Sequence, residues 1–309
     1  MDNSVNPPVR LQGVFSPVIT PFANDLQPDA ARLLKHCQWL LSHDVGLAVF
    51  GTNSEANSMS VGEKRVLLDA LVDAGVPGAR LMPGTGCCAL TDTVELTRHA
   101  VQRGAAGVLM LPPFYYKGVS DDGLFASYSE VIQRVGDQRL RIYLYHIPQV
   151  SQVPINLDLI ERLLKAYPGS IAGIKDSSGQ WDNTLAMLQR FQPQGLDVFA
   201  GSETFLLATL RHGGAGCITA TGNVNPGAIS ALYRHWQDAD ADTRQQELDA
   251  VRAAFARHPM IPALKAATAH FADDAVFANV RPPLVKLGAQ PAAELMAALQ
   301  SLDFVMKGV

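Results

Sequence analysis

One lysine in this sequence stands in surroundings that favour a reactive amine. Lys175 lies in the segment IAGIKDSS, residues 171–178, after two isoleucines, an alanine and a glycine. Lysine is rarely buried without a partner or a function. Burial disfavours the ammonium form of an amine, and a neutral amine can attack a keto group to form a Schiff base. The alternatives are a side chain that reaches solvent or one that pairs with Asp176, although alternation in a strand turns neighbouring side chains to opposite faces.

A tyrosine is the second candidate for chemistry. Tyr145 lies near the end of the segment RIYLYHIP, residues 141–148. A phenolic hydroxyl at the end of a buried strand can relay protons or stabilise an oxyanion. We interpret Tyr143 and His146 as packing residues, and we expect Pro148 to end the strand and stiffen the loop that follows.

Two further motifs contain residues suited to binding. GTNSEANS, residues 51–58, offers hydroxyl and amide side chains with successive backbone N–H groups, a combination suited to a carboxylate. GTGCCA, residues 84–89, matches a dinucleotide-binding pattern, but the next apolar segment ends without the acidic residue that would bind a ribose. We interpret its glycines as allowing close backbone approach. No cluster of His, Asp and Glu has metal-ligand spacing, so no metal site is predicted.

Short apolar segments alternate with helical patterns and would position these motifs. The eight expected strands are residues 13–22, 46–51, 80–86, 107–112, 141–148, 171–178, 196–203 and 216–223. Residues 60–75, between the second and third, have helical periodicity and a Ser60–Glu63 capping box. Eight strand–helix repeats predict an α/β fold, the (β/α)8 TIM barrel, whose functional sites lie at the C-terminal ends of the strands.

The length and composition agree with one large core. The chain has 309 residues, of which 48 % are hydrophobic, and we predict a barrel domain over residues 1–237. Residues 238–309 have helical patterns without strand patterns, and we expect C-terminal helices packed on the barrel.

Charge and cysteine content exclude several classes of function. The formal net charge of −4 gives no broad basic surface, so nucleic acid is not expected as a partner. The polar N-terminus and the lack of an apolar run near the ~20 residues of a membrane helix predict neither a signal peptide nor a membrane span. Four cysteines without a C-x-x-C motif are typical of reduced thiols, so we expect a cytoplasmic protein.

Four motifs together resemble the dihydrodipicolinate synthase and N-acetylneuraminate lyase family of pyruvate-dependent class I aldolases. GTNSE, PFYY, YHIP and GIKDSS occur in the family's order, one per βα unit, within about residues 13–225. The resemblance implies that Lys175 forms a Schiff base with the keto carbon of pyruvate and that Tyr145 transfers protons. It also implies that no metal or organic cofactor is needed.

The resemblance implies further site residues and an assembly. The hydroxyl of Thr52 would link Tyr145 to a second tyrosine, which would be Tyr115 or, because PFYYKGVS is one residue longer than in some relatives, Tyr116. Family members are commonly dimers of dimers, so a homo-oligomer is expected, either a dimer or a tetramer.

The pyruvate itself would be held by a second group of residues. The resemblance implies that Thr52 with Asn53 binds the pyruvate carboxylate and that backbone at Gly201 and Ile218 approaches the pyruvyl group. Asn53 and Ser54 stand where the family motif has Thr and Gly, so this carboxylate site differs in its side chains.

Other departures concern the second substrate. Val150 stands where true dihydrodipicolinate synthases have the arginine that binds the carboxylate of aspartate semialdehyde, and Arg141 should lie at the opposite end of the barrel. Cys88 replaces the asparagine that helps to bind the inhibitor lysine. We therefore expect weak use of aspartate semialdehyde, no inhibition by lysine, and better activity on neutral hydroxylated aldehydes.

The predicted function is a Schiff-base lyase or aldolase that cleaves or forms a 2-keto acid with pyruvate as the donor half. The expected substrates are 2-keto-3-deoxy sugar acids or 4-hydroxy-2-keto acids. The alternatives are 4-hydroxy-tetrahydrodipicolinate synthase, a 2-keto-acid dehydratase with the same Schiff-base lysine, and a barrel that binds 2-keto acids without turnover.

Overall fold

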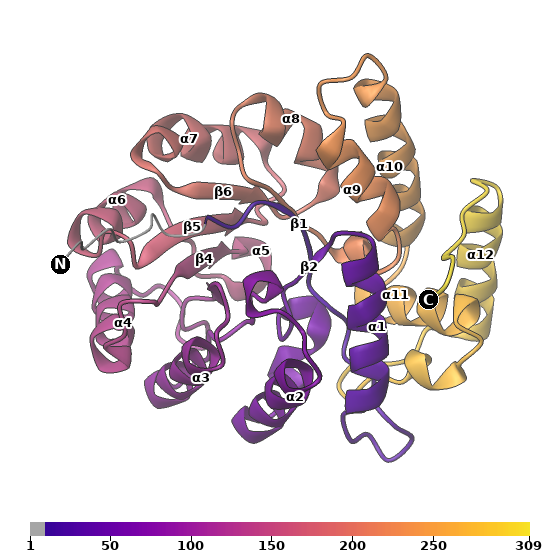
Figure 1. Ribbon diagram of the computed structural model, residues 1–309, viewed down its shortest axis with the longest axis horizontal. Helices are drawn as coiled ribbons and strands as arrows, with labels where there is room; N and C mark the ends of the chain where they lie inside the picture. Colours follow the sequence, from indigo (N-terminus) through magenta and orange to yellow (C-terminus); the bar gives the residue numbers. More distant parts are fainter. Residues whose placement is uncertain (1–9) are drawn as a thin grey trace.

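The strands form one curved parallel sheet at the centre of the molecule (Figure 1). The computed structural model describes residues 10–309. The prediction that the N-terminus is not a signal peptide concerns residues 1–9, which lie outside the described residues. The sheet has the order β2-β1-β7-β6-β5-β4-β3. Its strands are β1 Gly13–Ser16, β2 Gly46–Leu47, β3 Val108–Met110, β4 Ile142–His146, β5 Ile171–Asp176, β6 Asp197–Ala200 and β7 Gly216–Ile218.

The third predicted strand is not a regular strand, although its residues occupy the expected place. Leu81 makes an isolated parallel bridge to Leu47, and Gly84 makes one to Leu109, so residues 80–86 join β2 to β3. Pro83 has no N–H to donate to a neighbouring strand, so the segment lacks one of the hydrogen bonds of a regular parallel ladder. Within residues 10–309 the sheet therefore has seven regular strands and one irregular segment, and together they confirm the (β/α)8 barrel.

Helices surround the barrel in the order that the sequence predicts (Figure 1). They are α1 Ala30–Ser42, α2 Val61–Asp73, α3 Leu90–Gln102, α4 Asp121–Val135, α5 Pro148–Ser151, α6 Leu157–Ala166, α7 Trp181–Phe191, α8 Leu206–Arg211 and α9 Pro226–Arg234. The predicted capping box begins α2: Glu63 N donates to Ser60 Oγ over 3.2 Å, and Ser60 N donates to Glu63 Oε2 over 2.8 Å.

The last part of the chain forms three helices without strands between them. They are α10 Ala241–Ala256, α11 Met260–Phe271 and α12 Ala289–Gln300. α10 packs on α8 and α9, whereas α11 contacts the short 3-10 helices η1 Thr52–Ser54 and η6 Ala220–Asn223. The C-terminal helices thus reach the loops at the C-terminal ends of β2 and β7. No helix in the described part of the chain is long and apolar enough to cross a membrane.

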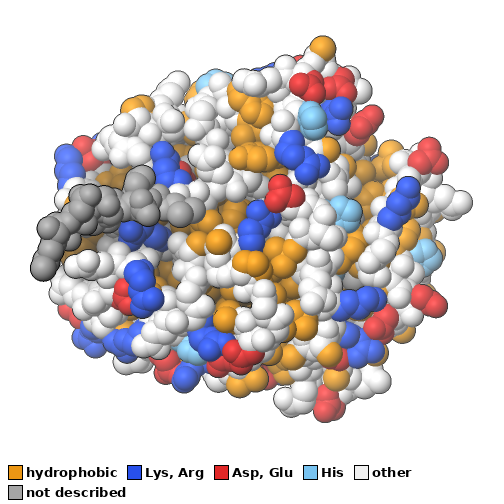
Figure 2. All heavy atoms as spheres, in the orientation of Figure 1, with side chains coloured by type: hydrophobic (Ala, Val, Ile, Leu, Met, Phe, Trp, Pro, Cys, Tyr) orange, Lys and Arg blue, Asp and Glu red, His pale blue; other side chains and the backbone are white. Residues whose placement is uncertain are grey.

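The interior of the barrel is filled by side chains. A cluster of buried residues, separate from the larger core between sheet and helices, contains Phe15, Ala48, Met82, Leu109, Tyr143, Tyr145, Phe199 and Ile218. Because the centre is packed, a ligand can enter only at an end of the barrel. On the face that Figure 2 shows, cationic and anionic side chains are interspersed, in agreement with the absence of a broad basic surface in the sequence.

Candidate active site

Lys175 lies inside the barrel near the C-terminal end of β5. It is in register with Tyr145 on β4 and with Phe199 on β6, and it is 2 % exposed. Its Nζ lies 4.3 Å from the centroid of the Tyr145 ring. Asp176 faces the other way, as alternation predicts, and accepts hydrogen bonds from Thr184 Oγ1 at 2.6 Å and from Ser178 N at 2.9 Å. The amine of Lys175 therefore does not pair with the neighbouring carboxylate.

The hydroxyl of Tyr145 meets the hydroxyl of Thr52. The Oη and Oγ1 atoms are 3.2 Å apart, and either can donate. Thr52 begins η1, a turn whose backbone hydrogen bonds are supplemented by two that involve side chains: Gly51 N donates to Ser54 Oγ at 3.1 Å, and Thr20 Oγ1 donates to Ser54 O at 2.8 Å. A fixed turn keeps the threonine hydroxyl in place, so the amine, the phenol and the hydroxyl form one contiguous group.

A cavity of about 460 Å³ opens over this group. Its lining includes Thr52, Asn53, Tyr145, Lys175 and Gly201, five of the residues singled out from the sequence. The volume falls in the range of about 300–1,000 Å³ that is typical of small-molecule sites. The structure therefore brings the reactive amine, the phenol and the polar turn to one small-molecule-sized cavity.

Gly201 stands where the backbone of β6 passes very close to the end of β5. A Cβ at this position would collide with the Oγ of Ser177 and approach the carbonyl oxygen of Asp176 to 2.7 Å. Only glycine fits such an approach. Its backbone therefore forms part of the cavity wall.

Three other candidates from the sequence lie outside the cavity lining. Ile218 is fully buried in the barrel interior on β7. Tyr115 and Tyr116 are 74 % and 72 % exposed, and their rings contact each other edge to face. Within residues 10–309, neither tyrosine completes the hydroxyl chain that begins with Tyr145 and Thr52.

The C-terminal helices supply residues to the cavity that the sequence analysis missed. Arg252 of α10 lines it, and so do Met260, Ile261 and Pro262 of α11. We expected these helices only to pack on the barrel. The local pattern around Arg252 is that of an ordinary amphipathic helix, so no sequence signal marked this residue.

A buried ion pair connects α11 to the turn that carries Thr52. Glu55 follows η1 in the left-handed conformation with φ 57°, and its carboxylate pairs with Lys265, both side chains being fully buried. Glu55 Oε2 accepts from Arg281 N at 2.9 Å, and Lys265 Nζ donates to Asn279 O at 2.6 Å. Burial lowers the pKa of Lys265 to about 8 against the opposing effect of Glu55. The position of Thr52 therefore depends on residues more than 200 positions away.

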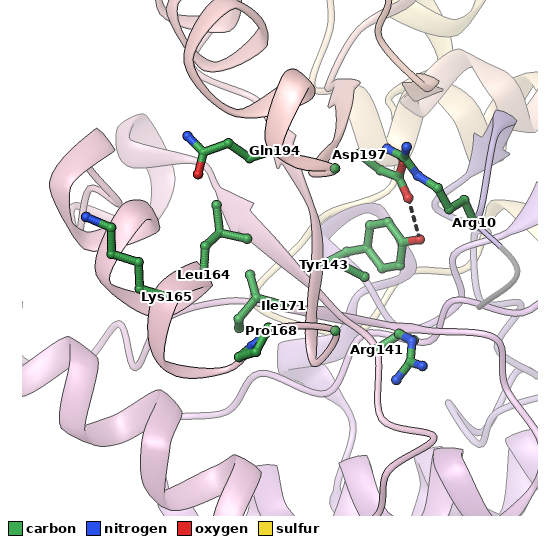
Figure 3. Close-up of a pocket in the computed structure, with 12 residues that line it drawn as sticks. Arg10, Arg141, Tyr143, Leu164, Lys165, Pro168, Ile171, Gln194 and Asp197 are labelled. Atoms are coloured by element: carbon green, nitrogen blue, oxygen red, sulfur yellow. Dashed lines mark hydrogen bonds and ion pairs between the residues drawn. The ribbon is translucent and has the colours of Figure 1, made fainter. Parts of the chain in front are cut away.

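The opposite end of the barrel contains a different polar group and a cavity of about 260 Å³ (Figure 3). Tyr143 Oη donates to Asp197 Oδ2 at 3.1 Å, and Arg10 Nε donates to Oδ1 at 2.7 Å. Burial raises the pKa of Asp197, while Arg10 opposes the shift. Arg141 lines this cavity, so it lies at the end away from Lys175, as its place at the start of β4 indicates. Tyr143 thus anchors the base of the barrel.

His146 has a structural role at the end of β4. Its Nδ1 accepts from Ile155 N at 3.0 Å, and burial lowers the pKa of the ring. The loop between them includes α5, which begins with Pro148. His146 therefore holds the loop beside the cavity, in agreement with its interpretation as a packing residue.

Comparison with known proteins agrees with this arrangement. The profile of the dihydrodipicolinate synthetase family matches residues 10–302. An uncharacterized DapA-like lyase of Chloroflexus aurantiacus is 34 % identical, over 94 % of this chain and 97 % of that protein. The structure of dihydrodipicolinate synthase from Agrobacterium tumefaciens superposes with a TM-score of 0.87 at 29 % identity, covering 94 % of this chain and 99 % of that one.

A second solved structure is similar over the same length. YagE, a prophage protein of the dihydrodipicolinic acid synthase family from E. coli K12, was solved in complex with pyruvate. It has a TM-score of 0.86 and 27 % identity, covering 95 % of this chain and 99 % of that chain. Because the family profile spans nearly the whole sequence and a relative that is 34 % identical covers 94 % of it, the chain belongs to the dihydrodipicolinate synthetase family of lyases.

Proposed function

We propose that this protein is a class I aldolase that cleaves or forms a 2-keto acid through a Schiff base between Lys175 and the pyruvyl half of the substrate. The observation that carries the proposal is the position of the Lys175 amine. It is buried, it has no carboxylate partner, and it lies over the ring of Tyr145 in a cavity of small-molecule size. The similarity to YagE, which was crystallised with pyruvate, supports the same donor.

In the first half of the reaction the substrate becomes covalently bound. The amine nitrogen of Lys175 attacks the keto carbon C2, the oxygen leaves as water after two proton transfers, and a protonated imine remains. Thr52 and Asn53 line the cavity beside the amine, and their side chains with the backbone N–H groups of the turn would bind the carboxylate at C1. Tyr145, next to Nζ, is placed to move protons during the loss of water.

In the second half the carbon–carbon bond breaks. Tyr145, as the phenolate that remains after it gives its proton to the departing water, accepts the proton of the C4 hydroxyl and later returns it to C3, while the Thr52 hydroxyl that contacts it donates a hydrogen bond to the phenolate. The electron pair of the C3–C4 bond moves into the protonated imine, which becomes an enamine, and the aldehyde leaves. Protonation at C3 and hydrolysis of the imine release pyruvate and regenerate the amine. Synthesis runs through the same steps in reverse.

We propose 2-keto-3-deoxy sugar acids or 4-hydroxy-2-keto acids as substrates. A second candidate is 4-hydroxy-tetrahydrodipicolinate synthase, because the A. tumefaciens enzyme is similar over the full chain. Val150 lines the cavity at the position where the synthases have an arginine, which favours the first candidate. A dehydratase would use the same imine but eliminate water instead of an aldehyde.

A panel of 2-keto acids assayed for pyruvate release tests the proposal. We expect the wild-type protein to release pyruvate from a 4-hydroxy-2-keto acid, and Lys175→Ala to release none. Lys165→Ala, which removes an exposed lysine of the surface, is the matched control and should keep full activity. A 2-keto acid product without pyruvate would identify a dehydratase, and condensation of pyruvate with aspartate semialdehyde would identify the synthase.

We also propose that the protein is a cytoplasmic homo-oligomer, a dimer or a tetramer. The resemblance to the family supports this assembly, and the exposed aromatic pair Tyr115 and Tyr116 offers apolar surface for a subunit contact. Analytical ultracentrifugation would measure the assembly, and a monomer at micromolar concentration would contradict it.

A further inference from the structure

Arg252 is the cation of the cavity that the reaction as proposed does not use. The cavity lining contains two cationic side chains, Lys175 on β5 and Arg252 on α10. The side chain of Arg252 is 24 % exposed. It therefore retains contact with the solvent-filled space while most of its surface is covered by protein.

The partner of Arg252 lies behind it and not in the cavity. Glu203 is 1 % exposed, does not line the cavity, and accepts hydrogen bonds from the hydroxyls of Thr219 and Thr221. Arg252 Nη1 is 3.4 Å from Glu203 Oε2 and 3.5 Å from Thr219 Oγ1. Both distances are at the long limit for a hydrogen bond. Glu203 thus makes closer hydrogen bonds with the two threonine hydroxyls than with Arg252, and its burial shields it from a ligand.

Most of the guanidinium remains available. Among residues 10–309, no acceptor lies within hydrogen-bond distance of Nε or Nη2 of Arg252. Nη1 alone of its three nitrogens therefore makes hydrogen bonds there. A guanidinium carries five N–H donors in a planar fork that matches a carboxylate. The part of the fork that faces the cavity is therefore free to bind an anion.

The surroundings strengthen such an interaction. Much of the remaining cavity wall is apolar and includes Ile147, Val150, Phe205, Met260, Ile261 and Leu284. The carboxylate of Asp176 also lines the cavity, but it accepts hydrogen bonds from the side chains of Ser178, Asn183 and Thr184. Apolar walls reduce the screening of a charge, so an anion bound there gains more from one arginine than it would at an open surface.

We propose that Arg252 binds an anionic group at the end of the substrate remote from the keto carbon, and that this group is a carboxylate. The inference rests on the proposed function, which fixes the keto carbon at Lys175. It selects dicarboxylic substrates, of which 2-keto-3-deoxyhexarates are an example, over 2-keto-3-deoxyhexonates, which end in a neutral hydroxymethyl group. The neutral preference expected from Val150 considered only the loop after β4, whereas α10 brings a cation from a different part of the chain.

The test compares this matched pair of substrates in the wild type and in Arg252→Gln. We expect the wild type to have the higher kcat/KM for the hexarate. Arg252→Gln should lower kcat/KM for the hexarate by about 10- to 100-fold, the scale of a lost charge-assisted hydrogen bond, mainly through KM. The hexonate should change by less than about 3-fold. Arg252→Lys should recover part of the loss, since it keeps the charge without the fork.

Two controls separate binding from folding. Arg244→Gln removes an arginine of the same helix that pairs with Asp240 at the surface, and it should behave as wild type. Arg252→Lys keeps a positive charge beside Glu203, so it remains informative if Arg252→Gln does not fold. The same preference can be measured without turnover by competition. Each compound is added at increasing concentration, and the concentration that blocks borohydride trapping of pyruvate is compared between the wild type and Arg252→Lys.

The results distinguish the inference from the proposed function. If pyruvate is trapped but the hexarate has no advantage in the wild type, or if the variants weaken both compounds equally, Arg252 does not select the substrate while the Schiff-base function stands. If pyruvate is not trapped at all, the proposed function itself fails.

Discussion

The ion pair between Glu55 and Lys265 leads to a quantitative prediction. Lys265→Met removes the cation and leaves the Glu55 carboxylate fully buried without its partner. Breaking a buried pair in this way costs about 3–5 kcal/mol. For a chain of 309 residues, an unfolding entropy of about 2.1 cal/mol/K per residue gives about 0.65 kcal/mol/K, so the Tm should fall by about 5–8 °C. Because Glu55 follows the turn of Thr52, we expect kcat to fall as well.

The double variant Glu55→Gln/Lys265→Met separates charge from packing. It contains no buried charge at the site, and the glutamine can still accept from Arg281 N, so most of the lost Tm and kcat should return. Calorimetry and steady-state kinetics measure both quantities. Lys165→Met is the control, because its ion pair with Glu161 is exposed and should be worth less than about 1 kcal/mol. Additive losses in the double variant, or an unchanged Tm in Lys265→Met, would refute the reasoning.

Three further predictions follow from the site and the fold. Tyr145→Phe should keep its fold and lose roughly 10²-fold in turnover, the scale of a lost acid–base group, as kinetics with a cleaved 2-keto acid would measure; full activity would place the proton relay elsewhere. Arg281 lowers the pKa of Glu63 from 4.5 to about 2, so the pair stabilises the fold above pH 4.5 and loses this effect as the pH falls to about 2. Glu63→Gln should therefore be less stable than wild type at pH 7 by about 1 kcal/mol, because solvent screens much of the interaction of this partly exposed pair, and denaturant titrations should show the difference vanish at low pH; a constant difference would contradict the assignment. Condensation of pyruvate with aspartate semialdehyde should have a kcat/KM well below about 10⁴ M⁻¹s⁻¹, without inhibition by lysine, because Arg252 repels the ammonium group beside the carboxylate of this aldehyde and Val150 supplies no second cation; a higher value would mean that Arg252 replaces the arginine that is absent at position 150.

The barrel and the centre of the site were predictable because their signals are local. The strand containing Lys175 is apolar around a single amine, and alternation alone separates it from Asp176, as the structure confirms. The turn at Thr52 and the strand end at Tyr145 belong to motifs of a few residues each. Since all strands of a barrel end at one face, local motifs at strand ends predict a shared site.

The remainder depended on contacts between distant segments. Glu55 and Lys265 pair across 210 positions, and nothing near either residue indicates the other. Arg252 lies in a helix whose pattern gives no sign of a cavity. The segment around Pro83 was expected to be a strand, but a missing amide N–H and two neighbouring glycines leave it with isolated bridges. Sequence periodicity reports which face of an element is buried, but not what it is buried against.

The central claim is that Lys175 forms an imine with a 2-keto acid. Incubation with pyruvate and borohydride, followed by mass spectrometry of the intact protein and its peptides, should show one reduced pyruvyl adduct on Lys175. The adduct should be absent from Lys175→Ala and present in Lys165→Ala. An adduct that persists in Lys175→Ala, or that maps to Lys117 or to the buried Lys265, would contradict the account.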